Sequence, residues 1–414
     1  MRFHRQTITV EQARSKLLAR ITPTTQEKVS LGEAFGRILA QDLVSPCDYP
    51  GFDRSPLDGY AVRATDTESA TVQQPVYLQV VEEIAAGDVP KMALGPGMAS
   101  RIMTGAMLPV GADAVIMFEQ TVNPGEKVQQ VGIKRKLTAW ENVSRRGEEV
   151  EQGSVIARSG EAVDAGMVAL LASFGITEVP VYRKPTIGIL STGSELIDFD
   201  QPLRPGMIRD SNSLMLQMLV LQAGGIPVLF DRLSDHSPAV KATIQRCADR
   251  VDLLVTTGGV SVGDKDIIAS LVDEAEVELL FNHVAMRPGS PTTAAMIGST
   301  PLCALSGNPG ACHLGFFLFV APVIRKMANL PAEPPRWRAI LAADCEKPSP
   351  FPRYLRGRIE VRNTTLYAIP DPPVKSGNVS RLKGSDCFIV IPAGGRGKRA
   401  GEEVEILCYQ HYLQ

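Results

Sequence analysis

Apolar and polar positions divide the chain into segments with different periodicities. Near the N-terminus, Thr9 is a good N-cap and Gln12 stands three residues later, so a capping box should open a helix that runs to about Ile21. The turn-rich stretch SPCDYPGFDRSPLDGYAV (45–62) then opens a region of short strands that reaches about residue 145. The run VDAGMVALLASFG (163–175) predicts an apolar helix that ends at Gly175.

From about residue 183 the pattern becomes an alternation of apolar strands and helices. Helical patterns such as SLMLQMLVLQAGG separate the strands, and each strand runs into a polar or glycine-rich loop. The four strands lie within TIGILSTGSEL, IPVLFDRLSD, VDLLVTTGGVSVGD and TPLCALSGNPGA. Such alternation predicts βαβ units and a doubly wound parallel sheet. After PAEPP (331–335), a linker by composition, the remaining residues read as a small all-β domain.

These patterns predict a multi-domain α/β plus β protein, in line with a length of 414 residues. The expected parts are an N-terminal region from 1–49 plus 146–182, a β-rich second domain over 50–145, a doubly wound domain over 183–330 and an all-β, barrel-like domain over 336–414.

Composition and charge narrow the possible partners and location. With 44% apolar residues and a net charge of −2, the chain lacks the basic excess expected for nucleic acid or an anionic membrane as main partner. The N-terminus shows no apolar run like that of a signal peptide, and no apolar stretch reaches the roughly 20 residues of a membrane span. Seven scattered cysteines without a C-x-x-C favour reduced thiols. We therefore expect a cytoplasmic protein without a nucleic-acid or membrane partner.

The stretch TTGGVSVGDKD (256–266) allows two interpretations. Its G-V-S-V-G fits a nucleophile elbow with Ser261 as nucleophile, and only His283 is a fair candidate for the later histidine. Asp264 and Asp266, however, would put negative charge where an oxyanion must form. The alternative is a phosphate-binding loop, in which Gly258, Gly259 and Gly263 let backbone N–H groups approach an anion. We favour the phosphate loop.

Polar residues also follow the other strands of the predicted sheet. Ligands of open α/β sheets bind at the carboxyl ends of the strands, so these residues should share one edge. They are Glu195, Asp235, Asp264, Asp266, Asn308 and Pro309. Carboxylates beside a phosphate call for a hard cation between them, and oxygen ligands suit Mg²⁺. The chain has no G-x-x-x-x-G-K-[ST] motif, so it is not a P-loop NTPase. The sequence predicts Mg²⁺-assisted binding of a phosphorylated or nucleotide-like anion.

Several motifs resemble one family, from about residue 8 to the C-terminus. STGSEL, RDSNS, TTGGVSVGDKD, RPGSP and LSGNPGA are similar to the molybdopterin-binding domain. SPLDGYAV (55–62), RIMTGAMLPVGADAVIMFEQ (101–120) and ENVSRRGEEVEQGSVI (141–156) resemble the MoeA family of molybdopterin molybdenumtransferases, which includes the E domain of gephyrin. The resemblance implies Mg²⁺-dependent insertion of molybdate into adenylylated molybdopterin with release of AMP.

The resemblance also implies an elongated homodimer, with the N-terminal region as its dimerisation part. Molybdopterin adenylyltransferase and molybdoenzyme apoproteins or their chaperones are the implied partners. Two other functions stay open: adenylyl transfer to molybdopterin, which the first two regions argue against, and a non-catalytic molybdopterin-binding scaffold. Tungstate is conceivable in place of molybdate.

Matching the motifs residue by residue implies two sets of site residues. The implied catalytic residues are Asp58, Thr104, Glu195, Asp235 and Asp266, of which Glu195, Asp235 and Asp266 would hold the metal. The implied substrate-binding residues are Arg145, Arg146, Glu149, Gly258, Gly259, Ser261, Asp264, His283, Arg287, Ser290, Ser306, Asn308, Pro309 and Ser376.

Some of these positions depart from the family pattern. His283, Arg287 and Ser290 stand where lysines are common, although Arg287 still offers a cationic fork to an oxyanion. Glu149 replaces an aspartate. Ser144 and Ser306 replace an arginine and a proline. These replacements leave the choice of oxyanion open.

Overall fold

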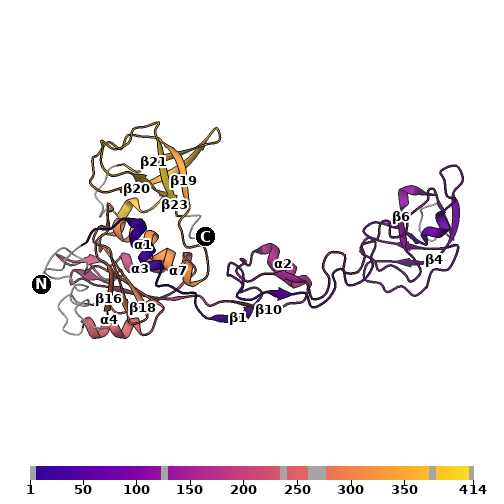
Figure 1. Cartoon of the computed structure of the whole chain (residues 1–414), viewed down its shortest axis with the longest axis horizontal. Helices are drawn as coiled ribbons and strands as arrows, with labels where there is room; N and C mark the ends of the chain where they lie inside the picture. The colour runs from indigo at the N-terminus through magenta and orange to yellow at the C-terminus, as the bar shows by residue number, and fades with distance from the viewer. Residues whose placement is uncertain (1–5, 123–128, 234–239, 260–276, 373–378, 410–414) are drawn as a thin grey trace. The chain divides into compact units, whose positions relative to one another are not determined.

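The computed structural model describes residues 6–122, 129–233, 240–259, 277–372 and 379–409 (Figure 1). The chain forms two compact units, residues 1–27 with 181–414 and residues 28–180. The division falls within β1 (Gln26–Ser30) and β10 (Glu178–Tyr182), which form a two-stranded sheet. The finer division into four regions stays a prediction.

The unit of residues 28–180 begins and ends in a small part built on a short sheet. Strands β2 (Leu43–Val44) and β9 (Val155–Ala157) pair there, and helix α2 (Ala165–Ser173) follows. The predicted end of α2 is confirmed: Gly175 has φ +70° and its amide donates to the Ala172 carbonyl. Although α2 is apolar throughout, Leu171 is its one buried residue.

The rest of this unit is the predicted β-rich domain, a six-stranded sheet in the order β6-β3-β5-β4-β8-β7. Its elements are β3 (Gly59–Val62), η1 (Ala64–Thr67), β4 (Val76–Ile84), β5 (Met98–Ile102), β6 (Ala114–Met117), η2 (Phe118–Gln120), β7 (Thr121–Val122) and β8 (Gln130–Ile133). Strand β3 is fully buried, and Tyr60 and Ala61 contribute to two separate apolar clusters. Alternate side chains of one strand thus fill the core on both faces.

The second unit contains the predicted doubly wound domain, whose sheet runs β14-β11-β15-β18-β17-β16. Four strands are parallel as predicted: β14 (Ile226–Leu229), β11 (Thr186–Ser191), β15 (Leu253–Thr257) and β18 (Thr300–Leu305). The sequence did not predict that β17 (Thr293–Ile297) and β16 (Val277–Phe281) extend the sheet in antiparallel fashion. A β-hairpin needs no helical crossover, so this part lacks the alternation used for the prediction.

Helices cover this sheet and supply most of its core. They are α1 (Val10–Leu18), α3 (Asn212–Gln222), α4 (Val240–Ala248), α6 (Pro309–Gly315), the π-helical η3 (Phe316–Val320) and α7 (Ala321–Met327). The capping box of Thr9 and Gln12 is confirmed, but α1 ends at Leu18, three residues before the predicted end. The segment Pro309–Met327 is long and apolar enough to cross a membrane, yet 89% of its window is buried, as in a core helix.

The C-terminal domain is a closed five-stranded barrel, which confirms the predicted small all-β domain. Its elements are β19 (Arg336–Leu341), β20 (Arg353–Arg362), β21 (Thr365–Pro370), η4 (Val379–Arg381), β22 (Cys387–Ile391) and β23 (Glu403–Cys408). Closure leaves no exposed sheet edge.

Two short strands of the α/β domain, β12 (Leu196–Ile197) and β13 (Ile208–Arg209), pair outside its main sheet.

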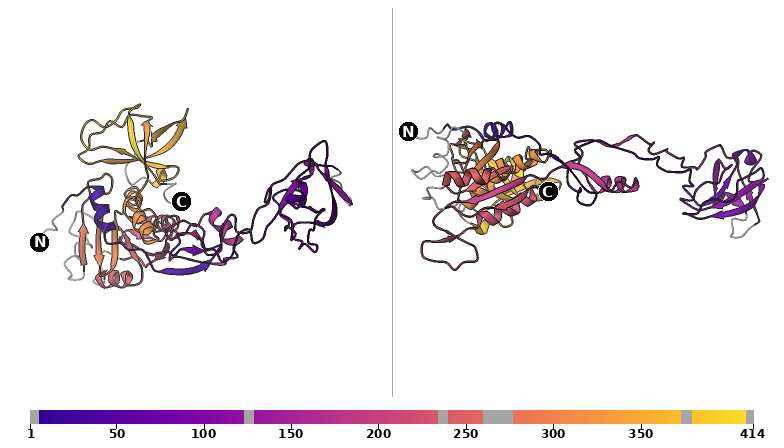
Figure 2. Two further views of the ribbon diagram at one scale, coloured as in Figure 1. Left: turned by 45° about the vertical axis from the view of Figure 1, so that its right-hand side comes forward. Right: turned by 90° about the horizontal axis from the view of Figure 1, so that it is seen from below.

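The left view of Figure 2 shows the strands of the barrel in orange to yellow. The barrel packs against the α/β domain through a cluster of aromatic side chains. The His313 ring of α6 lies 5.5 Å from the Phe388 ring and 5.0 Å from the Tyr409 ring. Burial lowers the pKa of His313 to about 4, so this imidazole is neutral at physiological pH. His313 is therefore a core residue of the contact between domains, consistent with the apolar pattern around it.

Candidate functional site

The carboxyl ends of the parallel strands converge as predicted. Beyond β11, the Thr192 amide donates to the Thr257 carbonyl at 2.9 Å. Beyond β15, the Gly258 amide donates to the Leu305 carbonyl at the end of β18. The loops after three neighbouring strands therefore form one continuous edge.

Asn212, at the first position of α3, ties this edge together. Its Nδ2 donates to Thr257 Oγ1 and to the Gly307 carbonyl, both at 2.9 Å. The neighbouring Asp210 accepts hydrogen bonds from the Ser213 amide and hydroxyl, which fixes the start of α3. The motif RDSNS gives no sign of this role in the sequence, because an asparagine at a helix start is ordinarily interpreted as a cap.

Buried oxygen atoms lie at this edge without a hydrogen-bond partner among the described residues, among them Thr192 Oγ1 and Asn212 Oδ1. Thr192 is 4% exposed and Asn212 7%. A buried polar atom without a hydrogen-bond partner costs free energy. A bound ligand or cation that contacts these two oxygens would remove that cost.

Steric constraints require glycine at position 258. Its φ is +88°, and a Cβ there would lie 2.3 Å from the Thr192 carbonyl oxygen. Because the Gly258 amide already donates within the sheet, Gly259 (φ +66°) is the described glycine of the loop whose amide could face a phosphate. The expectation that Gly258 offers its N–H to an anion is therefore wrong; its role is to allow the close approach of two loops.

Glu195 is exposed, and its carboxylate lies over Gly193, where a Cβ would meet Oε2 at 2.8 Å. No group of three His, Cys, Asp or Glu side chains that could hold a metal occurs within the described residues. The other two predicted ligands, Asp235 and Asp266, lie outside the described residues, as do Ser261, Asp264 and Ser376.

A cavity of about 220 Å³ lies where the barrel meets the α/β domain, and sequence reasoning did not find it. Three cationic side chains line it: Lys347, Arg353 and Arg356. The Arg356 side chain is 10% exposed, and its nearest carboxylate, that of Asp371, is 3.9 Å away. A buried guanidinium with so loose a partner favours an anion in this cavity.

The cavity adjoins the strand-end site through two loops. Pro288 and Gly310 line it, and Gly307, three residues before Gly310, lies close enough to Gly258 that its Cβ would be 3.5 Å from the Gly258 Cα. The backbone of Arg287, a predicted anion-binding residue, forms a parallel β-bridge with that of Arg353. In this bridge the Tyr354 amide donates to the Arg287 carbonyl. RPGSP thus sits at this cavity.

The other predicted residues near this cavity make local contacts. His283 Nδ1 lies 2.9 Å from Thr7 Oγ1, while the Ser290 hydroxyl donates to the Met286 carbonyl and closes its own loop. Ser306 Oγ accepts from the Asn308 amide, and Pro309 begins α6. These contacts shape loops, and a role in substrate binding stays a prediction for each residue.

In the other unit, the structure brings together two predicted catalytic residues that are 46 positions apart in the chain. Asp58 Oδ1 accepts hydrogen bonds from the Thr104 amide at 2.7 Å and from Thr104 Oγ1 at 2.8 Å. These two bonds hold the pKa of Asp58 below its ordinary value. Both residues are exposed, so the pair presents a fixed anion to solvent.

The predicted arginine cluster makes separate contacts in this unit. Arg146 pairs with Asp48 at 2.7 Å, and Glu149 pairs with Arg54 at 3.2 Å. Arg145 instead lies over the Trp140 ring, 4.7 Å from its centroid.

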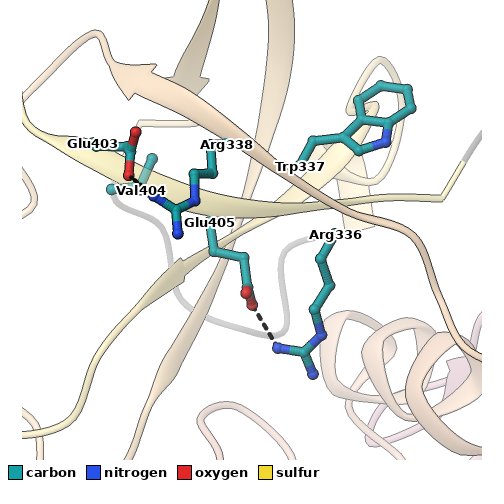
Figure 3. Close-up of a pocket in the computed structure, with 6 residues that line it drawn as sticks. All are labelled: Arg336, Trp337, Arg338, Glu403, Val404 and Glu405. Atoms are coloured by element: carbon teal, nitrogen blue, oxygen red, sulfur yellow. Dashed lines mark hydrogen bonds and ion pairs between the residues drawn. The ribbon is translucent and has the colours of Figure 1, made fainter.

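Another cavity, of about 340 Å³, lies on the outer face of the barrel (Figure 3). Arg336 pairs with Glu405 at 2.7 Å and Arg338 pairs with Glu403 at 2.8 Å, across β19 and β23. In each cross-strand pair the glutamate neutralises the arginine. This cavity therefore lacks the unbalanced positive charge of the cavity between the barrel and the α/β domain.

Comparison with known proteins gives matches over nearly the whole chain. The MoeA N-terminal region (domain I and II) matches residues 8–175, the probable molybdopterin binding domain matches 188–326, and the MoeA C-terminal region (domain IV) matches 338–409.

Individual relatives give the same picture. Molybdopterin molybdenumtransferase of Bacillus subtilis (strain 168) is 42% identical over 383 residues, 92% of this chain and 89% of that protein. The enzyme of the same name from Staphylococcus aureus (strain COL) is 37% identical over 404 residues, 97% of this chain and 96% of that protein. A crystal structure of the molybdopterin biosynthesis moeA protein of Pyrococcus horikoshii has a TM-score of 0.84 and 31% identity, and it covers 98% of this chain and 99% of that one. The resemblance and the fold class inferred from the motifs are confirmed.

Proposed function

The chain belongs to the MoeA family, enzymes of molybdenum cofactor biosynthesis, and from this premise we propose that it inserts molybdate into adenylylated molybdopterin and releases AMP. The observation that carries the proposal is the cationic cavity lined by Lys347, Arg353 and Arg356, which adjoins the glycine-rich strand ends. An oxyanion such as molybdate fits the cavity in charge, and the phosphates of the nucleotide fit the strand ends.

In this proposal the described residues divide the work between binding and orientation. Arg356 and Lys347 hold the oxyanion, and Asn212 keeps the β15 and β18 loops at a fixed separation. Fixing both reactants in this way removes most of the entropy cost of bringing them together.

The oxygen-rich strand ends also fit Mg²⁺. Thr192 Oγ1 and Asn212 Oδ1 lack partners among the described residues, and Glu195 adds a carboxylate nearby in the chain. Oxygen donors are what Mg²⁺ prefers. Glu195, with Asp235 and Asp266 from the sequence, would hold the cation, which when bound supplies positive charge to the phosphates as AMP leaves.

Replacing Arg356 by glutamine should raise the KM for molybdate about tenfold or more, because a buried charge-assisted contact is lost while most of the volume is kept. AMP release at varied molybdate concentration measures this. Arg362→Gln is the matched control, since Arg362 lies on the same strand but is exposed and paired with Glu360. If Arg356→Gln and Arg362→Gln show the same molybdate KM as the unaltered chain, the oxyanion does not bind in this cavity.

The proposed enzyme is a homodimer, and helix α2 supports this. A helix that is apolar all round is normally buried, yet α2 buries only Leu171 in the single chain. An arginine in place of the exposed Ala169 should shift the mass measured by light scattering from dimer to monomer. Ser159→Arg, at an exposed turn position of the same unit, serves as the control and should leave the mass unchanged. A monomeric unaltered chain would contradict the proposal.

A further inference from the structure

Trp140 has a backbone conformation that is unfavourable for a residue with a bulky side chain. Its φ is +68°, in a turn closed by the hydrogen bond from the Glu141 amide to the Thr138 carbonyl. A turn with positive φ at its third residue ordinarily has glycine or asparagine there, and a bulky residue at positive φ is rare. Strain of this kind persists where the surroundings or a function require it.

The Trp140 ring is available to a ligand. The residue is 42% exposed, although a tryptophan ring stabilises a protein most when it is buried, and Arg145 covers one face at 4.7 Å. An exposed cation–π contact stabilises a protein by less free energy than the positive φ of a bulky residue costs. The contact with Arg145 therefore does not account for the backbone conformation of Trp140.

Arg145 carries an unbalanced charge at this place. Its neighbours are neutralised, Arg146 by Asp48 and Arg54 by Glu149. No carboxylate among the described residues pairs with the Arg145 side chain, whose contact is the Trp140 ring; its backbone amide donates to Glu148. A flat aromatic surface beside an unbalanced guanidinium matches a ligand that joins a planar ring to an anionic group.

We propose that Trp140 and Arg145 form a stacking site for a planar heteroaromatic ring that carries a phosphate. The ring stacks on Trp140 or on the guanidinium plane, and the phosphate pairs with Arg145. The identity of the ligand as part of the substrate rests on the proposed function: either the adenosine end of the adenylylated substrate or its phosphorylated pterin end has this chemistry.

Trp140 also supplies the signal for the test, because the chain has two tryptophans and Trp337→Phe leaves Trp140 as the single tryptophan fluorophore. In that variant, AMP should quench the fluorescence saturably, adenosine should bind about tenfold more weakly, and ribose 5-phosphate should not quench. A pterin that carries a phosphate is the second arm. Tighter binding of AMP or of the pterin assigns the site to that end of the substrate.

Three variants separate stacking from a structural role. Trp140→Gly should bind whichever of AMP and the phosphorylated pterin quenches Trp140 more tightly about tenfold more weakly in equilibrium dialysis. Its Tm should be no lower, since glycine relieves the positive φ. Arg145→Gln should weaken AMP but not adenosine, whereas Arg158→Gln, an exposed arginine of the same unit, should change neither. In the Trp140→Phe chain, the Trp337 signal should not respond to AMP.

Absence of quenching by AMP and by the phosphorylated pterin at millimolar concentration, in a folded Trp337→Phe protein, would overturn the proposal. So would a Trp140→Gly protein that binds AMP and the phosphorylated pterin both as tightly as the unaltered chain does. The fluorescence test of the stacking site and the activity test of the proposed function can fail independently. Quenching without any molybdate-dependent AMP release keeps the stacking site and refutes the reaction, whereas release without quenching does the reverse.

Discussion

Replacing Gly258 by alanine should reduce AMP release about a hundredfold or more. The new Cβ would lie 2.3 Å from the Thr192 carbonyl oxygen, a backbone atom that cannot rotate away. The loop after β15 must therefore shift relative to the loop after β11, and misplacement of reacting groups by about 1 Å can cost on the order of a hundredfold in rate. Steady-state kinetics with the purified variant measures the effect.

Gly224→Ala is a matched control for this substitution. Gly224 has the same φ of +88°, but a Cβ there would meet nothing within 4 Å. The unfavourable backbone conformation should cost both variants about 1 kcal/mol of stability, and Gly258→Ala should lose more because of its clash with Thr192. Only Gly258→Ala should lose activity. Equal activity of the two variants would mean that the close approach of the loops does not matter for the reaction.

Replacing Asp58 by alanine should lower kcat/KM by about a hundredfold or more, if the fixed carboxylate acts on the substrate as the family motif implies. Thr104→Val should cause a smaller loss, because the bond from the Thr104 amide to Asp58 Oδ1 remains. Asp88→Ala is the control, since the Asp88 carboxylate accepts from the Ala85 amide in an exposed turn of the same unit. Activity in Asp58→Ala equal to that in Asp88→Ala would reduce Asp58 to a turn residue.

The pH dependence follows from the direction of the pKa shift. Hydrogen bonds from Thr104 lower the pKa of Asp58, so the carboxylate is ionised at and below the ordinary pKa of an aspartate. Protonation of Asp58 therefore removes activity only at still lower pH. An acidic limb of the pH–rate profile near neutrality must belong to another group, and it should persist in Thr104→Val.

The strand ends of the α/β domain could be predicted because parallel strands place their carboxyl ends at one edge. The periodicity located β11, β14, β15 and β18, and the structure joins three of these ends through Asn212 and Gly258. Strand direction was not readable where a hairpin replaces the helix, so the antiparallel pairing of β16 and β17 was not predicted.

The cavity with Arg356 could not be predicted, because segments distant in the chain form it. Residues 288, 310, 347, 353–356, 371–372 and 388 meet there only after the barrel docks on the α/β domain. In the sequence, the basic residues of RYLRGR look like those of any solvated strand. The conformation of Trp140 was equally hidden, since turn propensities place glycine or asparagine at such a position.

The most direct test of the proposed function is AMP release from purified adenylylated molybdopterin, with molybdate and Mg²⁺ each present or omitted. We predict release only when both are present, with loss of release in Gly258→Ala and a raised molybdate KM in Arg356→Gln. Release that does not depend on molybdate, or no release under any condition despite binding of the substrate, would contradict molybdenum insertion by this chain.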